Sequence, residues 1–214
     1  MLVAVVATAG LGFVPAAELI LYPLRLFVTI VHEGAHALAA LATGGHVESI
    51  VLLPTGSGLT RAAPGALGLY YMSGYVGTVA AGAAGLWLCR RERMGRLVLA
   101  GLGLLTAALT VLWIRNLFGF AAGAGIAGVL LLAAWRLPRP GADLVAAFLS
   151  VQLVLNAVLD IRTLLFLTTS TTLENDAVFM ARAFGGPPWF WAGAWAMVSA
   201  AILVGALRAY LRRR

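Results

Sequence analysis

Two histidines and a glutamate lie within about one helical turn of each other in an apolar stretch of the chain. His32 and Glu33 are adjacent, and His36 follows four residues after His32. The flanking residues, 26–31 and 37–41, are apolar and indicate a helix. Residues four apart on a helix project from the same face, so the two imidazoles are neighbours. This is the H-E-x-x-H arrangement, in which the histidines bind zinc and the glutamate acts as general base.

The apolar setting makes a bound metal the simplest explanation for these side chains. Near the centre of a bilayer, each ionisable group costs roughly 2.5–3.5 kcal/mol on insertion scales. Zinc bound by protein ligands contributes roughly 10–16 kcal/mol, which offsets that cost. The alternative is a pair of core histidines hydrogen-bonded between helices, but the ligand spacing of His32 and His36 favours the metal. We therefore expect Zn²⁺ as the cofactor and Glu33 as the catalytic base.

Zinc held by two histidines needs a third protein ligand, because a catalytic site keeps its fourth position for water. Asp160 is the favoured candidate, since it lies within a long apolar run. A carboxylate in such a run is a functional residue by default. Asn156 lies one turn before Asp160 on the same helix face. We expect Asp160 to complete a metal site with His32 and His36.

Two other residues remain alternatives for the third ligand. Asp176 is one, although it also fits the start of a short helix over residues 177–184, with an asparagine before it as the cap. His46 is the other, ten residues after His36. It follows two glycines at a helix end, so it can equally lie in the headgroup region.

The composition identifies the class of protein that must hold these residues. Hydrophobic residues make up 62% of the 214, and charged residues only 11%. That balance is typical of a polytopic membrane protein and not of a soluble domain. We expect an all-α membrane protein, a bundle of about seven transmembrane helices forming a single domain over residues 1–214. The predicted spans are residues 2–21, 24–43, 69–89, 97–114, 117–135, 144–168 and 189–211.

The basic residues indicate the orientation of the bundle. The net charge is +7, and every basic residue other than histidine is arginine. Most of the arginines lie in short clusters at the ends of spans, at residues 90–96, 136–139 and 208–214, a pattern that does not indicate nucleic-acid binding. Alternating spans place these clusters on one side, which the positive-inside rule assigns to the cytoplasm. We expect an integral protein of a bacterial plasma membrane with a cytoplasmic C-terminus and no nucleic-acid partner.

A segment of different character follows the motif helix. Residues 47–53 are rich in β-branched side chains, and residues 54–58 are a turn-forming cluster. Residues 59–62 can form a second strand that pairs with the first. This predicts a β-hairpin at the membrane interface or dipping into it. An edge strand there can bind an extended peptide through main-chain hydrogen bonds.

The motif region resembles a known family. A transmembrane helix with H-E-x-x-H, then Thr-Gly-Gly at residues 43–45, a β-rich loop and a helix of small residues, is similar to the site-2 protease type of intramembrane zinc metalloprotease. The similarity is greatest to the compact bacterial M50B-like branch. It implies a zinc bound by the two histidines and Asp160, a catalytic Glu33, and Asn156 as a substrate-binding residue. It also implies that the substrate is a membrane-embedded protein or peptide.

The functional prediction is a zinc-dependent intramembrane peptidase that hydrolyses a peptide bond of a membrane-embedded substrate. The alternative is a non-catalytic membrane protein of the same fold, a binding or scaffolding relative that keeps the polar cluster. A small metal transporter fits less well, because such proteins usually show paired repeats with broken helices and none is evident here.

Overall fold

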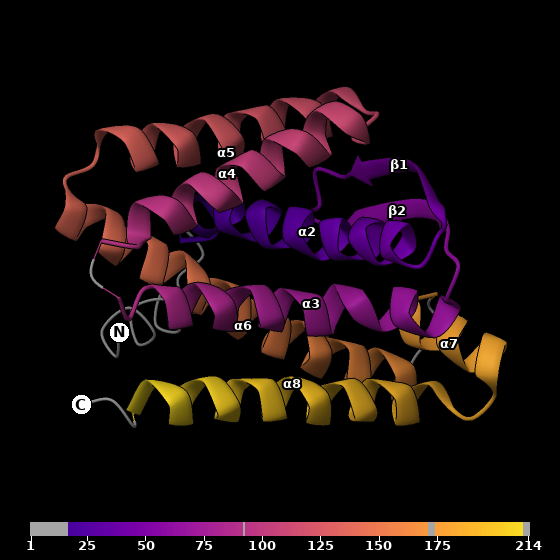
Figure 1. Cartoon of the computed structure of the whole chain (residues 1–214). Helices are drawn as coiled ribbons and strands as arrows, with labels where there is room; N and C mark the ends of the chain where they lie inside the picture. The colour runs from indigo at the N-terminus through magenta and orange to yellow at the C-terminus, as the bar shows by residue number, and fades with distance from the viewer. Residues whose placement is uncertain (1–16, 92, 171–173, 212–214) are drawn as a thin grey trace.

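Seven helices and one β-hairpin form the described part of the chain in the computed structural model (Figure 1). The structure describes residues 17–91, 93–170 and 174–211. The elements are α2 (Ala17–Ala42), β1 (His46–Leu52), β2 (Gly58–Ala63), α3 (Leu67–Leu88), α4 (Gly95–Leu112), α5 (Leu117–Arg136), α6 (Arg139–Ser170), α7 (Asp176–Phe184) and α8 (Pro188–Leu211). The mostly helical fold and the small hairpin after the motif helix are confirmed.

The predicted count of about seven spans is confirmed only in part. Within the described residues, five helices are long and apolar enough to cross a membrane: α2, α4, α5, α6 and α8. α3 has 22 residues but is not apolar enough, because it contains three tyrosines and several glycines. The first predicted span, residues 2–21, lies mostly outside the described residues, and its last part continues through Pro23 as the start of α2.

The outer helices have surfaces that suit lipid. α5 and α8 bury only a small part of their apolar length inside the protein. Leu117, Val129 and Trp135 of α5 are among the large apolar side chains left exposed. Apolar exposure on this scale is unfavourable in water and matches a hydrocarbon environment. The chain is therefore an integral membrane protein.

α2 is the central element of the fold. α4 and α5 form a pair on one side of it, and α3, α6 and α8 lie on the other (Figure 1). Phe27 and Val28 of α2 pack into an apolar core with Leu99 of α4 and Leu153 of α6. Past the end of the helix, Gly44 adopts a φ of +80°, which glycine takes without strain. The chain turns there and enters β1.

The hairpin runs back alongside α2. β1 and β2 pair antiparallel, with Leu52 opposite Gly58 next to the turn. The hydroxyl of Tyr22 in α2 donates a hydrogen bond to the backbone carbonyl of Pro54 in that turn, at 2.7 Å. Tyr22 lies 20 residues before the end of α2 at Ala42, which is about 30 Å along a helix. The hairpin therefore penetrates beside an apolar helix instead of lying at its end.

The connection between α4 and α5 covers the outer edge of β1. The Ile50 amide donates to the Trp113 carbonyl at 2.7 Å, and the Ile50 carbonyl accepts from the Arg115 amide at 3.1 Å. The Asn116 side chain accepts from the Leu52 amide at 3.1 Å and donates to the Leu52 carbonyl at 2.7 Å. In the part of the chain that the structure describes, the opposite edge of the sheet, on β2, has no strand partner.

Asn116→Ala should weaken the attachment of β1 to the α4–α5 connection. Leu52 is fully buried, and its amide and carbonyl would lose their partners, so we expect a loss of about 2–4 kcal/mol in the free energy of unfolding. The Tm in detergent should fall by roughly 4–16 °C. Leu117→Ala is the matched control, because the neighbouring Leu117 is 87% exposed. Equal Tm values for the two variants would contradict the anchoring role of Asn116.

Candidate metal centre

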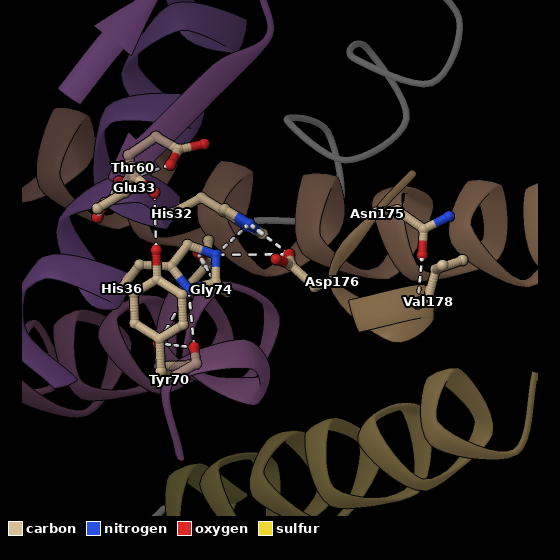
Figure 2. A network of polar contacts seen from close by, with 11 residues as sticks. His32, Glu33, His36, Thr60, Tyr70, Gly74, Asn175, Asp176 and Val178 are labelled. Carbon is tan, nitrogen blue, oxygen red and sulfur yellow. Dashed lines mark hydrogen bonds and ion pairs between the residues drawn. The ribbon is translucent and has the colours of Figure 1, made fainter. Parts of the chain in front are cut away.

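His32, His36 and Asp176 converge at one point (Figure 2). Their ligating atoms all lie within 4.8 Å of one another. His36 Nε2 is 3.1 Å from His32 Nε2, and Asp176 Oδ2 is 3.4 Å from His36 Nε2 and 3.7 Å from His32 Nε2. Two ligands of a tetrahedral zinc at ordinary bond lengths lie about 3.3 Å apart. The three donor atoms therefore fit zinc closely.

The ring of His36 is held in the orientation that a metal requires. Its Nδ1 donates a hydrogen bond to the backbone carbonyl of Tyr70 at 2.7 Å. That bond places the proton on Nδ1 and leaves Nε2 free to bind a metal. The Tyr75 ring packs edge-on against His32, with 4.7 Å between ring centroids. Both rings are thus supported from α3.

Gly74 of α3 provides the space in which the two imidazoles meet. A Cβ atom at this position would lie 2.3 Å from His32 Nε2 and 2.5 Å from His36 Nε2. Any side chain there would overlap the atoms that point toward Asp176. The close approach of α3 to the motif helix at Gly74 is therefore part of the site.

Asp176 comes from the short helix α7. Asn175, directly before it, caps α7 by accepting a hydrogen bond from the Val178 amide at 3.1 Å. Ala177 and Met180 are buried in an apolar cluster that residues of α6 and α8 complete. Burial alone would raise the pKa of the Asp176 carboxyl, but the two imidazoles hold it below its usual range. The carboxylate is therefore ionised, which is the form that binds metal.

The residues favoured from the sequence line the same space. A cavity of about 950 Å³ lies between α2, the hairpin, α3, α6 and α7. Asp160 and Asn156 line it from α6, and the Asn156 amide donates to the Gln152 carbonyl at 2.9 Å. Within the described residues, Asp160 is not part of the converging group. His46 is exposed at the start of β1. The geometry favours Asp176, one of the two alternatives, as third ligand.

Glu33 is joined to the hairpin by a chain of hydrogen bonds. Its side chain is buried, and its Oε2 accepts a hydrogen bond from the Thr60 hydroxyl at 2.7 Å. The Thr60 carbonyl accepts one from the Tyr70 hydroxyl at 2.7 Å. A Cβ atom at Gly58 would lie 2.7 Å from Glu33 Oε1. β2 therefore passes directly beside the carboxylate, and Tyr70 links this strand to the ring of His36.

Sequence reasoning missed Thr60, Tyr70 and Gly74. All three contact residues of α2 that are distant from them in the sequence. The available signal was weak: a threonine in a predicted return strand, a tyrosine in a helix of small residues, and a glycine whose spacing to Gly77 indicates only close helix packing. Gly77 does pack in that way, against Ala35 of α2.

A family model described as Peptidase M50B-like matches residues 1–206. The matched range includes the motif helix, the hairpin, α7 with Asp176, and most of α8. Searches of curated proteins and of solved structures found no significant match.

Proposed function

Because the chain belongs to the Peptidase M50B-like family, we propose that it is a zinc-dependent intramembrane peptidase acting on a membrane-embedded protein or peptide. The observation that carries the proposal is the convergence of Asp176 of α7 with His32 and His36 of α2, the helix that also holds Glu33. In this assignment the three convergent residues hold the zinc and leave one position for water.

Glu33 is the residue that would move protons. A bound zinc would polarise the substrate carbonyl and lower the pKa of water toward about 7. The Glu33 carboxylate would take a proton from the attacking water and deliver it to the amine that leaves. Its Oε2 already accepts a hydrogen bond from the Thr60 hydroxyl, so Oε1 is the oxygen that would accept the proton from water. The C–N bond breaks, the carbonyl carbon gains a hydroxyl, and the products carry a new carboxylate and a new amine.

The free edge of β2 offers a binding place for an extended substrate. Ile50 and Leu52 of β1 direct their backbone groups away from β2, so their partners Thr60 and Gly58 direct theirs to the outer edge. Tyr70 occupies the Thr60 carbonyl. Within the described part of the chain, the Thr60 amide and both backbone groups of Gly58 have no partner and could form main-chain hydrogen bonds to a peptide. Helical carbonyls are already bonded and shielded, so the substrate would unwind before it binds.

Glu33→Gln tests the proposal directly. An amide cannot accept the proton, so cleavage should fall by about 10²–10⁴-fold. Zinc content should stay near one per chain, because Glu33 is not a ligand. Cleavage is measured by mass spectrometry on a synthetic single-span peptide with a glycine-rich centre, reconstituted with the protein in lipid vesicles. Equal cleavage by both proteins would refute the mechanism, and a zinc-loaded wild type that cleaves nothing would favour the non-catalytic relative.

Thr60→Val should slow the same reaction without removing zinc. Valine has nearly the shape of threonine but cannot donate to Glu33 Oε2, so the buried carboxylate loses its hydrogen bond. We expect kcat to fall by roughly 10-fold, or about 1.4 kcal/mol, with little change in KM. Thr60→Ser keeps the hydroxyl and should recover most of the rate. A valine variant with the wild-type kcat would show that this hydrogen bond does not position Glu33.

A further inference from the structure

Arg25 is a charged side chain in the apolar helix that also carries the two histidines. It is the one arginine in the membrane-span candidate Leu21–Ala42. It lies seven residues before His32, so the two residues share a face of α2. Both line the cavity of about 950 Å³. A charged side chain that faces a cavity from within an apolar helix is a functional residue by default.

The turn of the hairpin restricts the position of Arg25. The hydroxyl of Thr29, one helical turn after Arg25, donates a hydrogen bond to the Gly56 carbonyl at 2.7 Å. Gly56 has a φ of +88°, and a Cβ atom there would lie 2.7 Å from Arg25 Cδ. The turn therefore packs on the aliphatic part of the Arg25 side chain and limits the places that its guanidinium can occupy.

The guanidinium of Arg25 has no hydrogen bond or ion pair among the residues that the structure describes. Arg182, by contrast, is paired with Glu174 at 2.7 Å. Asp160, on the α6 wall of the cavity, is near enough to interact electrostatically with Arg25 but does not hydrogen-bond to it. A guanidinium offers a planar pair of donors that matches a carboxylate. The chemistry that fits this position is therefore a carboxylate that enters the cavity.

We propose that Arg25 binds an acidic side chain of the substrate, about three residues from the bond that is cut and on its C-terminal side. This assignment rests on the proposed peptidase function. The segment from Arg25 to His32 spans about 10 Å along α2, and an extended peptide advances about 3.3 Å per residue. The substrate class is thus a membrane segment that unwinds next to an acidic residue.

The direction of the substrate follows from the hairpin. β2 begins next to the turn at Gly58, beside Glu33, and ends at Ala63. Antiparallel pairing is slightly more stable than parallel pairing, and an antiparallel peptide on the free edge of β2 would run from the Ala63 end toward the turn. The residues after the cut then lie on the side of Gly56 and Arg25.

Peptide binding to the Glu33→Gln protein tests the proposal without cleavage. The probes are fluorescent single-span peptides with blocked termini and a glycine-rich centre, in which each central position in turn carries Asp, Asn or Lys. Binding is measured in phosphatidylcholine vesicles. At the best position, Asp should bind about tenfold more tightly than Asn. Adding Arg25→Gln should remove this preference, and adding Arg25→Glu should favour Lys.

Arg61→Gln is the matched control, because it removes another exposed arginine of the cavity lining. It should keep the preference for Asp. Zinc should stay near one per chain in the Arg25 variants, since Arg25 is not in the converging group of ligands. If Arg25→Gln does not hold zinc, Arg25→Lys, which keeps the charge but not the paired donors, should weaken the preference instead. Equal binding of Asp and Asn peptides at every position, or a preference that survives loss of Arg25, would overturn the assignment.

Cleavage by the wild-type protein separates this proposal from the peptidase function. Mass spectrometry should place the cut about three residues before the Asp of the best-binding peptide, and a cut after that Asp would overturn the direction. Binding that depends on Asp and Arg25 without any cleavage would support the carboxylate site and contradict the peptidase. Equal cleavage of the Asp and Asn peptides would support the peptidase and contradict the role of Arg25.

Discussion

Asp176→Ala is expected to empty the metal site, whereas Asp160→Ala leaves the zinc bound. The Asp176 carboxylate lies 3.4 Å and 3.7 Å from the two imidazole nitrogens, and Asp160 is not in the converging group of described residues. Loss of a ligand should lower zinc affinity by more than the roughly 10–100-fold that loss of a supporting hydrogen bond costs. Cleavage should fall to background with it. Zinc per chain, measured after dialysis, should drop from about one to near zero.

The control for this experiment is Glu174→Ala. Glu174 is a carboxylate two residues before Asp176, but it is exposed and paired with Arg182. Its loss should leave zinc bound, so the pair of variants separates a ligand from a nearby negative charge. A variant Asp160→Ala that loses zinc while Asp176→Ala keeps it would restore the ligand set that the sequence favoured.

The choice between Asp160 and Asp176 is where sequence reasoning reached its limit. Asp160 was favoured because a carboxylate in an apolar run suggests a metal ligand, and it lines the same cavity as the histidines, but within the described residues it is not part of the converging group. Asp176 was ranked lower because it fits a helix start. The structure is compatible with both roles, since Asn175 caps α7 and the carboxylate of the next residue lies within 3.7 Å of both imidazole nitrogens. Only the docking of α7 on its neighbours reveals this, and no local pattern encodes that contact.

Local patterns did predict the elements that carry the site. The apolar runs on either side of His32, the two glycines after residue 43 and the turn cluster before β2 are local features of the sequence. The structure has a helix, a helix end and a hairpin at these places. The predicted span over residues 69–89 corresponds to α3, which is not among the five helices long and apolar enough to cross a membrane, because tyrosine and glycine replace larger apolar residues in it. The functions of Thr60 and Tyr70 depend on how the hairpin lies against α2, which no short window of sequence contains.

Gly74→Ala is expected to abolish zinc binding although Gly74 offers no ligand. The added methyl carbon would lie 2.3 Å from His32 Nε2 and 2.5 Å from His36 Nε2, well inside van der Waals contact. The rings cannot simply turn away, because His36 Nδ1 is bonded to the Tyr70 carbonyl and His32 packs against Tyr75. We expect zinc content near zero, cleavage at background, and a fall in stability of about 1–3 kcal/mol from overpacking.

A packing control makes the Gly74 result specific. Gly77→Ala adds a methyl group to the same face of α3, where it would lie 2.8 Å from the Ala35 side chain, with no imidazole nearby. This variant should lose a comparable amount of stability and keep its zinc. If both variants lose zinc equally, close packing of α3 on α2 in general sets the geometry of the centre. If only Gly74→Ala loses zinc, glycine is required at this one position. The absence of a side chain there keeps open the space in which two nitrogens and a carboxylate oxygen converge.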